Sequence, residues 1–402
     1  MQLADALRLA ISHQNAGRID AASDIYKQIL EVQPENPIAN TLMARIRMRA
    51  TDIIGAEGLL AIAIKAAPDY IQAHATLGEC LTRRDQPALA THAYRRVAIL
   101  QPDHKAALLE LGNLLQNADR LEEAATLYRR LLRIDPNWAV AANNLAQGEL
   151  KLGHPEPAFE LTEGILSRDI ANVRANALRL AALQQWGRLE EVDERVRLGE
   201  CARAIEFDLP DAWTDFGAFN ANLSRDLHEH PNLVADWDPM RRALRGGSAI
   251  PQFDEHHTPV IDAFMAMLNT RIEQYITELP ERAAHPFLGR KPSGSYRLEI
   301  WGNILSGDHF QSAHIHNLGW MSGVYYVTVP ESIHGEDEEQ AGWLEFNRPG
   351  YGIPYSGPEG LPAICPTAGQ AMFFPSYVWH RTLPFTGDGE RISIAFDLIP
   401  TE

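Results

Sequence analysis

Prolines recur along the first half of the chain at a constant separation of 34 residues, at Pro34, Pro68, Pro102 and Pro136. A fixed period of about 20–50 residues is typical of a repeat array, in which each unit buries its apolar face only against its neighbours. Two sets of small residues keep the same register, and we expect two helices to cross closely where they meet. These sets are Ala10, Ala44, Gly78, Gly112 and Ala146, and Ala22, Ala56, Ala90, Ala124 and Ala158.

Further positions repeat in the same phase. A large residue follows the second small one at Tyr26, Leu60, Tyr94 and Tyr128. Turn residues between the paired helices stand at Gly17, Asp85, Asp119, Gly153 and Gly187. This pattern resembles the tetratricopeptide repeat over residues 1–204, with about six copies. The resemblance implies an α-solenoid, a superhelix of helix pairs with a concave face.

In the repeat family, the first helix of each pair lines the concave face, which implies a groove for a protein or peptide partner. An alternative interpretation is that these helix faces are solvated, or that they pack against the other domain or against a second copy of the chain in a homodimer. The groove candidates are Arg45, Arg49, Arg83, Asn113, Asn117, Asn143, Gln147 and Lys151.

The charge of the chain restricts its partners. With 53 acidic and 36 basic residues, the formal net charge is -17, so we expect no nucleic-acid partner. No run of 18 apolar residues occurs and the N-terminal stretch is amphipathic, so we expect a cytoplasmic protein without a membrane partner. Cys80, Cys201 and Cys365 show no paired spacing and are interpreted as reduced core thiols.

The second half of the chain changes character after Asp208, where the repeat phase is lost. Residues 205–294 alternate long helical patterns, such as VIDAFMAMLNTRIEQYI, with loops, and we interpret them as a helical linker and entry helices. In residues 295–402, short runs rich in Val, Ile, Tyr and Phe are separated by Gly, Pro and Asp. This pattern predicts a β-sandwich or barrel, so the chain belongs to the multidomain α plus β class.

Three features of the β-rich part indicate a metal site. His314 and His316 flank Ile315 in an extended segment, where alternation places both imidazoles on one face. His380 ends the apolar run AMFFPSYVWH and Arg391 begins the last strand, so we expect both in the same cavity. Imidazole suits ferrous iron, zinc and copper, and three protein ligands leave positions open for a chelating cosubstrate and O2. An arginine in the cavity can clamp a carboxylate with two hydrogen bonds.

The segments HIHNLGWMSGVYYVTVP and FFPSYVWHRTLPFTGDGERISIAF resemble a family of 2-oxoglutarate- and Fe(II)-dependent oxygenases, distant relatives of the prolyl 4-hydroxylases. The resemblance spans about residues 210–399 and implies a double-stranded β-helix, or jelly roll, with flanking helices. It also implies that His314 and His380 bind Fe(II) and that Arg391 pairs with the distal carboxylate of 2-oxoglutarate. The residues implied to support that carboxylate are Ser393 and one of Tyr325 and Tyr326.

Position 316 departs from the superfamily pattern. The superfamily normally has Asp or Glu two residues after the first histidine, whereas this chain has His316. Its spacing predicts a third iron ligand, and the alternatives are that it supports a ligand or contacts the substrate. A site of three histidines would leave the iron more positive than one with a carboxylate ligand. His309 is a weaker candidate, and the pairs interpreted as surface residues are His228/His230 and His256/His257.

The predicted activity is a hydroxylation coupled to oxidative decarboxylation of 2-oxoglutarate, with Fe(II) as the metal and O2 as the oxidant. A repeat groove fused to such a domain favours a protein or peptide substrate. One alternative is a cupin-like dioxygenase with three histidines and no 2-oxoglutarate. In that case the glutamate expected soon after HIH is missing, and Arg391 has no task. The other alternative is a non-catalytic repeat scaffold, against which intact His314, His380 and Arg391 argue.

Overall fold

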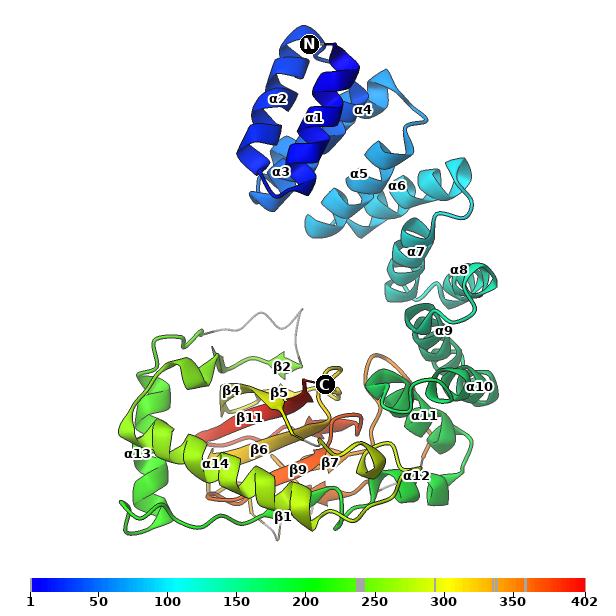
Figure 1. Cartoon of the computed structure of the whole chain (residues 1–402). Coiled ribbons are helices and arrows are strands. Elements are labelled where there is room, and N and C mark those ends of the chain that lie inside the picture. The colour runs from blue at the N-terminus through cyan, green and yellow to red at the C-terminus, as the bar shows by residue number, and fades with distance from the viewer. Residues whose placement is uncertain are drawn as a thin grey trace. The chain divides into compact units, whose positions relative to one another are not determined.

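The computed structural model of the 402-residue chain describes residues 2–235, 243–292, 294–334, 336, 339–357 and 360–401. It divides into two compact units, Met1–Gly148 and Glu149–Glu402, and each is described by itself. The first unit consists of helices, and the second combines helices with antiparallel sheets (Figure 1). An α-solenoid and a β-rich domain, the two parts predicted from the sequence, are therefore both present.

The first unit is built from helix pairs that follow the predicted period. The turn inside each pair contains a residue with positive φ, at Gly17, Thr51, Asp85 and Asp119. Three of these turn residues were predicted, and Thr51 takes the same left-handed conformation in the remaining pair. The helices are α1 (Leu3–Asn15), α2 (Ile19–Val32), α3 (Pro37–Arg49), α4 (Ile53–Ala66), α5 (Ile71–Arg83), α6 (Pro87–Leu100), α7 (Lys105–Asn117), α8 (Leu121–Ile134) and α9 (Ala139–Lys151), which crosses into the second unit.

Small residues lie where paired helices cross, as predicted. Ala10 and Ala22 of the first pair are both 0% exposed. A Cβ atom added to Gly112 would lie 2.6 Å from the ring of Tyr128 in the partner helix. The aromatic ring therefore occupies the space that a larger residue at position 112 would need, because protein interiors are close-packed.

The second unit continues the helix pairs and adds further helices. Gly153 and Gly187 provide positive φ at the same repeat position as the turns of the first unit. The remaining α-helices are α10 (Pro155–Leu166), α11 (Val173–Gln185), α12 (Leu189–Val196), α13 (Phe216–His228) and α14 (Pro259–Glu278), and the 3-10 helices are η1 (Phe253–Glu255) and η2 (Leu288–Arg290).

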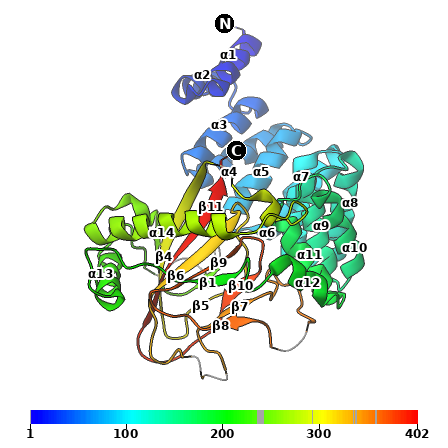
Figure 2. The ribbon, with the colours of Figure 1, turned by 60° about the horizontal axis from the view of Figure 1, so that its bottom comes forward.

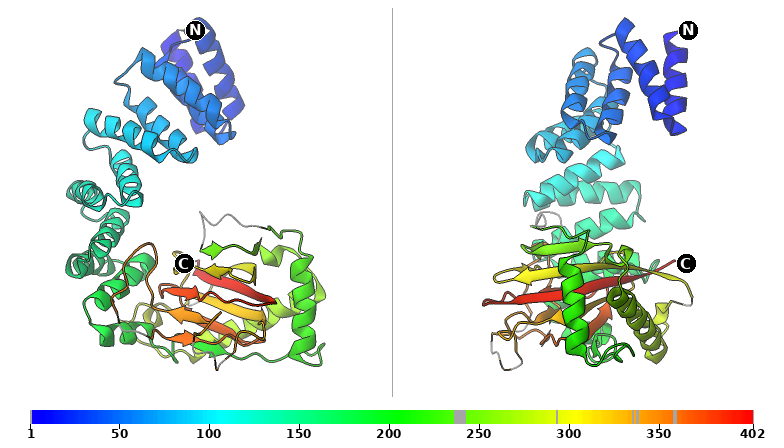
Figure 3. Two further views of the ribbon diagram at one scale, coloured as in Figure 1. Left: turned by 180° about the vertical axis from the view of Figure 1, so that it is seen from behind. Right: turned by 90° about the vertical axis from the view of Figure 1, so that its left-hand side faces the viewer.

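Among the described residues, antiparallel sheets of different size form the β part. The larger has six strands in the order β1-β9-β6-β11-β4-β3, the smaller has the order β10-β7-β8, and a short pair joins β2 to β5. Figure 3 shows the strands of the larger sheet from behind and from one side. The strands are β1 (Arg203–Ile205), β2 (Leu244–Arg245), β3 (Ser248–Pro251), β4 (Tyr296–Ser306), β5 (Phe310–Gln311), β6 (Met321–Thr328), β7 (Leu344–Phe346), β8 (Ala363–Ile364), β9 (Ala371–Pro375), β10 (His380–Thr382) and β11 (Glu390–Pro400).

One face of the larger sheet is covered by α14, which lies across the strands in Figures 1 and 2. Phe264 of α14 packs on Tyr325 of β6, with ring centroids 5.0 Å apart. Tyr275 of α14 packs on Phe373 of β9 at 5.2 Å. Side chains alternate between the two faces of a sheet, so every second residue of these strands points away from α14. Those residues are the ones that can line a cavity.

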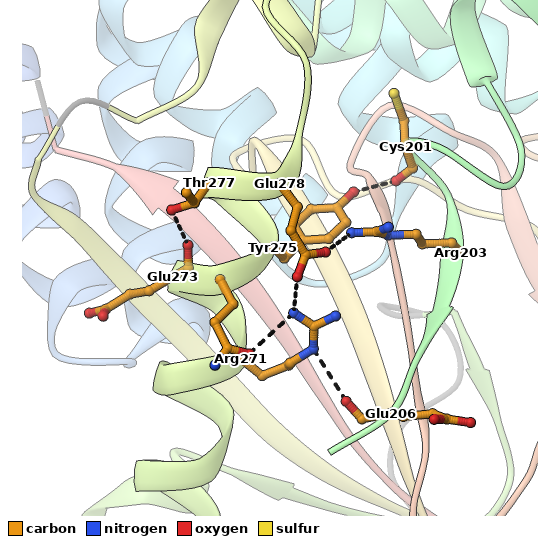
Figure 4. A network of polar contacts seen from close by, with 9 residues as sticks. Cys201, Arg203, Glu206, Arg271, Glu273, Tyr275, Thr277 and Glu278 are labelled. Carbon is orange, nitrogen blue, oxygen red and sulfur yellow. Dashed lines mark hydrogen bonds and ion pairs between the residues drawn. The ribbon is translucent and has the colours of Figure 1, made fainter. Parts of the chain in front are cut away.

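The end of α14 is tied to β1 and the segment before it by a polar network (Figure 4). The carboxylate of Glu278 forms ion pairs with Arg203 and with Arg271, the latter at 2.9 Å. The Tyr275 hydroxyl donates to the carbonyl oxygen of Cys201 at 2.5 Å. Of the three cysteines predicted to be core thiols, Cys80 and Cys201 are buried free thiols, whereas Cys365 is half-buried.

The repeat helices of the second unit are joined directly to its β part. Trp379, which is 0% exposed, donates its indole N–H to the carbonyl oxygen of Ala177 in α11 at 2.8 Å. The Tyr377 hydroxyl donates to the carbonyl oxygen of Arg195 in α12 at 2.7 Å. These two repeat helices and the sheets therefore share one core.

The domain boundaries predicted at residues 204 and 294 mark the end of the repeat pattern and the start of the β-rich part. The compact units divide between Gly148 and Glu149 instead, because the last repeat helices pack on the β part. The predicted helical segment 205–294 does contain α13 and α14. It also contains β3, which pairs with β4, and β1 begins at Arg203, so the larger sheet recruits short strands from before residue 295.

Candidate metal centre and cofactor cavity

Three histidines predicted from the HIH spacing and the distant AMFFPSYVWH run come together in the second unit. His314 and His380 each donate their backbone N–H to the carbonyl oxygen of the other, at 3.0 and 3.2 Å. The backbone N–H of His316 donates to the carbonyl oxygen of Ser376 at 3.1 Å. These backbone hydrogen bonds fix the segment that carries the rings of His314 and His316. One ring nitrogen from each histidine lies within 4.8 Å of the other two. The ring centroids are 4.2 to 5.1 Å apart.

Each of the three rings uses its Nδ1 atom in a hydrogen bond. Nδ1 of His314 and of His380 lies 2.8 and 3.0 Å from the backbone carbonyl oxygen two residues earlier in the chain. Nδ1 of His316 lies 2.6 Å from Oδ1 of Asp397. Because these oxygens accept hydrogen bonds, each Nδ1 carries the hydrogen and each Nε2 presents a lone pair.

Burial keeps two of these rings uncharged. Burial, and next the neighbouring His316, lowers the pKa of His314 to about 3. Burial, and next His314, lowers the pKa of His380 well below its ordinary value. Neutral imidazoles gathered with their Nε2 lone pairs available form the donor set that a first-row divalent metal prefers, so the residues fit Fe(II).

Arg391 lies on the cavity face of β11 and is 1% exposed. Among the residues that the structure describes, its Nε and Nη1 atoms have no hydrogen-bond partner. Nδ2 of Asn303, which is 3% exposed and on the adjacent strand β4, also lacks one within the described part of the chain. Burial lowers the pKa of Arg391, and a buried cation without a counter-ion is costly. These unused donors therefore fit a carboxylate group.

The residues predicted to support that carboxylate lie on different faces of the sheet. Tyr326 and Ser393 are paired in register and buried, and Ser393 shares its face of β11 with Arg391. The guanidinium of Arg391 lies 5.0 Å from the centroid of the Tyr326 ring. Tyr325 points to the opposite face, where its hydroxyl donates to Asn220 at 2.8 Å. Of the two tyrosines, Tyr326 is thus the one beside Arg391.

A cavity of about 950 Å³ connects the histidines with Arg391. Its volume lies near the upper end of the range for small-molecule sites, about 300–1,000 Å³. Trp301 lines it and stacks on His316 with ring centroids 5.5 Å apart. Leu318 and Tyr351 also line it and are exposed on the surface, at 68% and 41%. The cavity therefore opens between apolar side chains.

One wall of this cavity is a loop held by a repeat helix. Gln184 of α11 donates to the carbonyl oxygen of Asn347 at 2.8 Å. Gln185 donates to the carbonyl oxygen of Pro354 at 3.0 Å. Tyr351, in the middle of this loop, has φ of 58° and packs on Trp379 at 5.1 Å. The loop 347–354 is thus fixed at both ends by neighbouring glutamines of α11.

Two cavity residues, Asp397 and Asn303, were not predicted. Both are polar residues inside strongly apolar strands, RISIAFDLIP and YRLEIWGNILS, and that composition was the available signal. Asp397 lies six positions after Arg391, so strand alternation places both on one face. The sequence does not show which face of these buried strands lines the cavity, because residues on both faces are apolar.

The other histidines lie away from the cluster. His309 occupies the turn before β5, and the surface prediction holds for His228 and His257. For His230 that prediction was wrong, because it is 3% exposed and its Nε2 lies 3.1 Å from the carbonyl oxygen of Phe253. A ring that satisfies backbone groups inside the fold cannot be recognised from LHEHP alone.

The predicted groove residues differ in accessibility. Four of them are exposed, namely Arg45, Arg49, Arg83 and Asn117. Asn113 Oδ1 accepts hydrogen bonds from Tyr128 and Asn144 at 2.9 and 2.7 Å, and Asn143 is 4% exposed. Gln147 and Lys151 are half-buried, and Lys151 belongs to the second unit. A role in partner binding stays a prediction for this set.

Comparison with known families matches both parts of the chain. The family model described as "Putative 2OG-Fe(II) oxygenase" matches residues 299–397, and a tetratricopeptide-repeat model matches residues 7–71 and 81–137. The chain therefore combines tetratricopeptide repeats with an oxygenase-family region that includes all three clustered histidines and Arg391. No curated protein matches the chain. Among the described helices, none is both long and apolar enough to cross a membrane.

Several solved structures match part of the chain. YrrB, a TPR protein with an unusual peptide-binding site, is 20% identical, with 42% of this chain and 88% of YrrB covered and a TM-score of 0.39. PilF of Pseudomonas aeruginosa is 15% identical, with 47% and 86% covered and a TM-score of 0.41. A MamA protein is 19% identical, with 40% and 88% covered and a TM-score of 0.39.

Proposed function

We propose that this chain is an Fe(II)- and 2-oxoglutarate-dependent dioxygenase that hydroxylates a protein or peptide substrate. The observation that carries the proposal is the combination, in one cavity, of three convergent imidazoles and a buried guanidinium with unused N–H groups. A cupin-like dioxygenase without 2-oxoglutarate would leave Arg391 buried without an anion, which disfavours that alternative. A non-catalytic scaffold would have no use for the histidine cluster.

In this proposal each residue has a defined task. His314, His316 and His380 hold Fe(II) through Nε2, while their Nδ1 hydrogen bonds fix the ring orientations. Arg391 holds the distal carboxylate of 2-oxoglutarate together with Asn303, which also lines the cavity, while Tyr326 and Ser393 support Arg391 from beside it. The bound iron supplies the oxidising power from O2 and 2-oxoglutarate. The protein orients the cosubstrate and the substrate carbon and keeps bulk water out.

The substrate class follows from the fusion with repeats. A repeat region that binds a protein or peptide raises its effective concentration at a site on the same chain. The exposed groove candidates on α3, α5 and α7 are the residues that would contact such a partner. A homodimer and the cytoplasmic location stay predictions from the sequence.

The test is the visible metal-to-ligand charge-transfer band that 2-oxoglutarate produces on Fe(II) in anaerobic protein. We expect the band in the unmodified chain and its loss in His314→Ala and in His380→Ala. His316→Ala decides whether two or three histidines hold the metal. Arg391→Ala is expected to raise the 2-oxoglutarate concentration needed for half-saturation, without removing the metal. His309→Ala is the matched control, because this histidine lies in the turn before β5.

Absence of the band in iron-loaded unmodified protein at saturating 2-oxoglutarate would contradict the assignment. The substrate class needs a separate test, because the charge-transfer band reports only cofactor binding. Succinate formation on addition of a candidate peptide, reduced by Arg45→Ala together with Arg49→Ala, would support the repeat groove. Equal turnover of a small molecule by residues 149–402 alone would count against a protein substrate.

A further inference from the structure

Asp397 stands directly behind one of the three histidines. Its Oδ1 atom lies 2.6 Å from Nδ1 of His316, and both side chains are only 10% exposed. The carboxylate lies on β11 and lines the same cavity as Arg391. A charged hydrogen bond of this length in a largely buried place is stronger than one between neutral groups.

The carboxylate of Asp397 accepts a hydrogen bond from one buried serine, Ser322, which contacts a second, Ser376. The Ser322 hydroxyl on β6 donates to Asp397 Oδ1 at 2.6 Å. The hydroxyls of Ser322 and Ser376 lie 2.8 Å apart, and both serines are 0% exposed. Gly319 leaves room for this group, since a Cβ there would lie 2.4 Å from Ser376 Oγ and 3.4 Å from Asp397 Cγ. The orientation of the carboxylate is therefore fixed before any ligand binds.

The other two histidines have a different partner. Nδ1 of His314 and Nδ1 of His380 each meet a backbone carbonyl oxygen, which carries no net charge. The cavity also contains Glu299, in register with Asp397 on the adjacent strand, but its carboxylate pairs with Arg297 at 2.5 Å and is 43% exposed. Among the described residues of the cluster, His316 is thus the histidine whose ring is hydrogen-bonded to a carboxylate.

We infer that Asp397 is a positioning residue that supplies, through His316, the negative charge that a carboxylate ligand at position 316 would give. The inference rests on the proposed function, because it assumes that His316 holds the metal. A carboxylate that accepts the Nδ1–H of a ligand imidazole fixes its ring and increases the basicity of its Nε2. The negative charge that a carboxylate ligand would place on the metal is thus present one residue further away, on Asp397.

Metal affinity tests this inference without turnover. The full chain is titrated anaerobically with Fe(II), and with Co(II) as a spectroscopic probe, in the unmodified protein and in Asp397→Asn. The asparagine is close in size and can still accept the Nδ1 hydrogen, so the substitution mainly removes the charge. We expect the dissociation constant to rise about 10- to 100-fold. Glu299→Gln, the matched control in the same cavity, is expected to leave it unchanged.

A second background separates a positioning role from a structural one. In His316→Asp the ligand itself carries the charge, and Asp397 becomes a neighbouring like charge. Asp397→Asn is then expected to leave metal affinity unchanged or to raise it. An equal loss in both backgrounds would overturn the inference, because it would mean that Asp397 acts on the fold. Ser322→Ala, which removes one donor to the carboxylate, is expected to give a smaller loss in the unmodified background.

The outcomes distinguish the inference from the proposed function. If the unmodified chain binds no metal, the proposed function fails. If it binds metal in a His314-dependent way while Asp397→Asn has the same affinity as the unmodified chain, only the inference fails. The melting temperature of each metal-free variant shows whether it is folded, and Ser322→Ala carries the test if Asp397→Asn is not.

Discussion

Helices α7 and α11 occupy the same position in their repeats, but they differ in how much of their surface is buried. In α7 the buried residues form one stripe: Ala107, Leu108, Leu111, Gly112, Leu115 and Gln116. In α11 every residue from Ala175 to Gln184 is buried. A helix buried on all sides belongs to a core, whereas a striped one has a solvated face. The same repeat motif thus forms a stack in the first unit and packs into the core of the β-rich second unit.

The strongest test of this comparison is truncation within the repeats. We expect residues 149–402 to fold, because they include α10–α12 together with the sheets. Residues 205–402 should fail to fold, because they lack α11 and α12 and therefore expose Trp379 and the rest of the core that these helices cover. Circular dichroism and thermal unfolding of both chains measure this. A cooperative transition of residues 205–402 at the same temperature would show that α11 is dispensable.

The next largest effect is expected for Trp379→Ala. This change removes a fully buried ring and its hydrogen bond to Ala177, and should destabilise the second unit by about 3–5 kcal/mol. Hydrogen exchange followed by mass spectrometry in the full chain reports each unit separately. The first unit should keep its protection. Trp186→Ala, at a ring that is 40% exposed, is the control and should cost much less.

A smaller loss, confined to the first unit, is expected for Gly112→Val. The added side chain would collide with the ring of Tyr128, and overpacking of this kind costs about 1–3 kcal/mol. Gly58→Val in α4 is the control, because nothing lies within 4 Å of a Cβ at that position. Faster hydrogen exchange in both units would contradict the independence of their cores.

The smallest effect is expected for Gln185→Ala. This side chain donates to the carbonyl oxygens of Leu150 and Pro354, at 3.1 and 3.0 Å. Its loss should destabilise the second unit by about 0.5–1.5 kcal/mol, as measured by urea unfolding. Asn117→Ala, at an exposed position on α7, should change the stability of neither unit. Unchanged stability in Gln185→Ala would mean that the loop 347–354 is held by its other contacts.

The repeats could be predicted closely because their signal is periodic. Turn residues, small crossing residues and large partners each recur every 34 residues, so one copy supports the others. The histidine cluster could also be anticipated, since alternation places His314 and His316 on one face whatever the rest of the fold. Both predictions depend on local geometry that the sequence contains.

The remaining features depend on contacts between segments far apart in the sequence. Nothing in the repeat pattern indicates that Trp379 packs on α11, because a repeat helix that faces solvent and one that faces a sheet need the same small residues. The choice between Tyr325 and Tyr326 requires knowing which face of β6 lies under α14. Asp397 is separated from His316 by 81 residues and becomes its partner only when β11 lies beside β6.

The border between the two compact units falls inside α9, ahead of the last repeat helices. Duplication, deletion or exchange of repeats before Gly148 would leave the core of the second unit intact. Recombination at the end of the repeat pattern, near residue 204, would cut through a core. The smallest unit that can be exchanged with the oxygenase-family region therefore includes the last repeat helices, because they share its core.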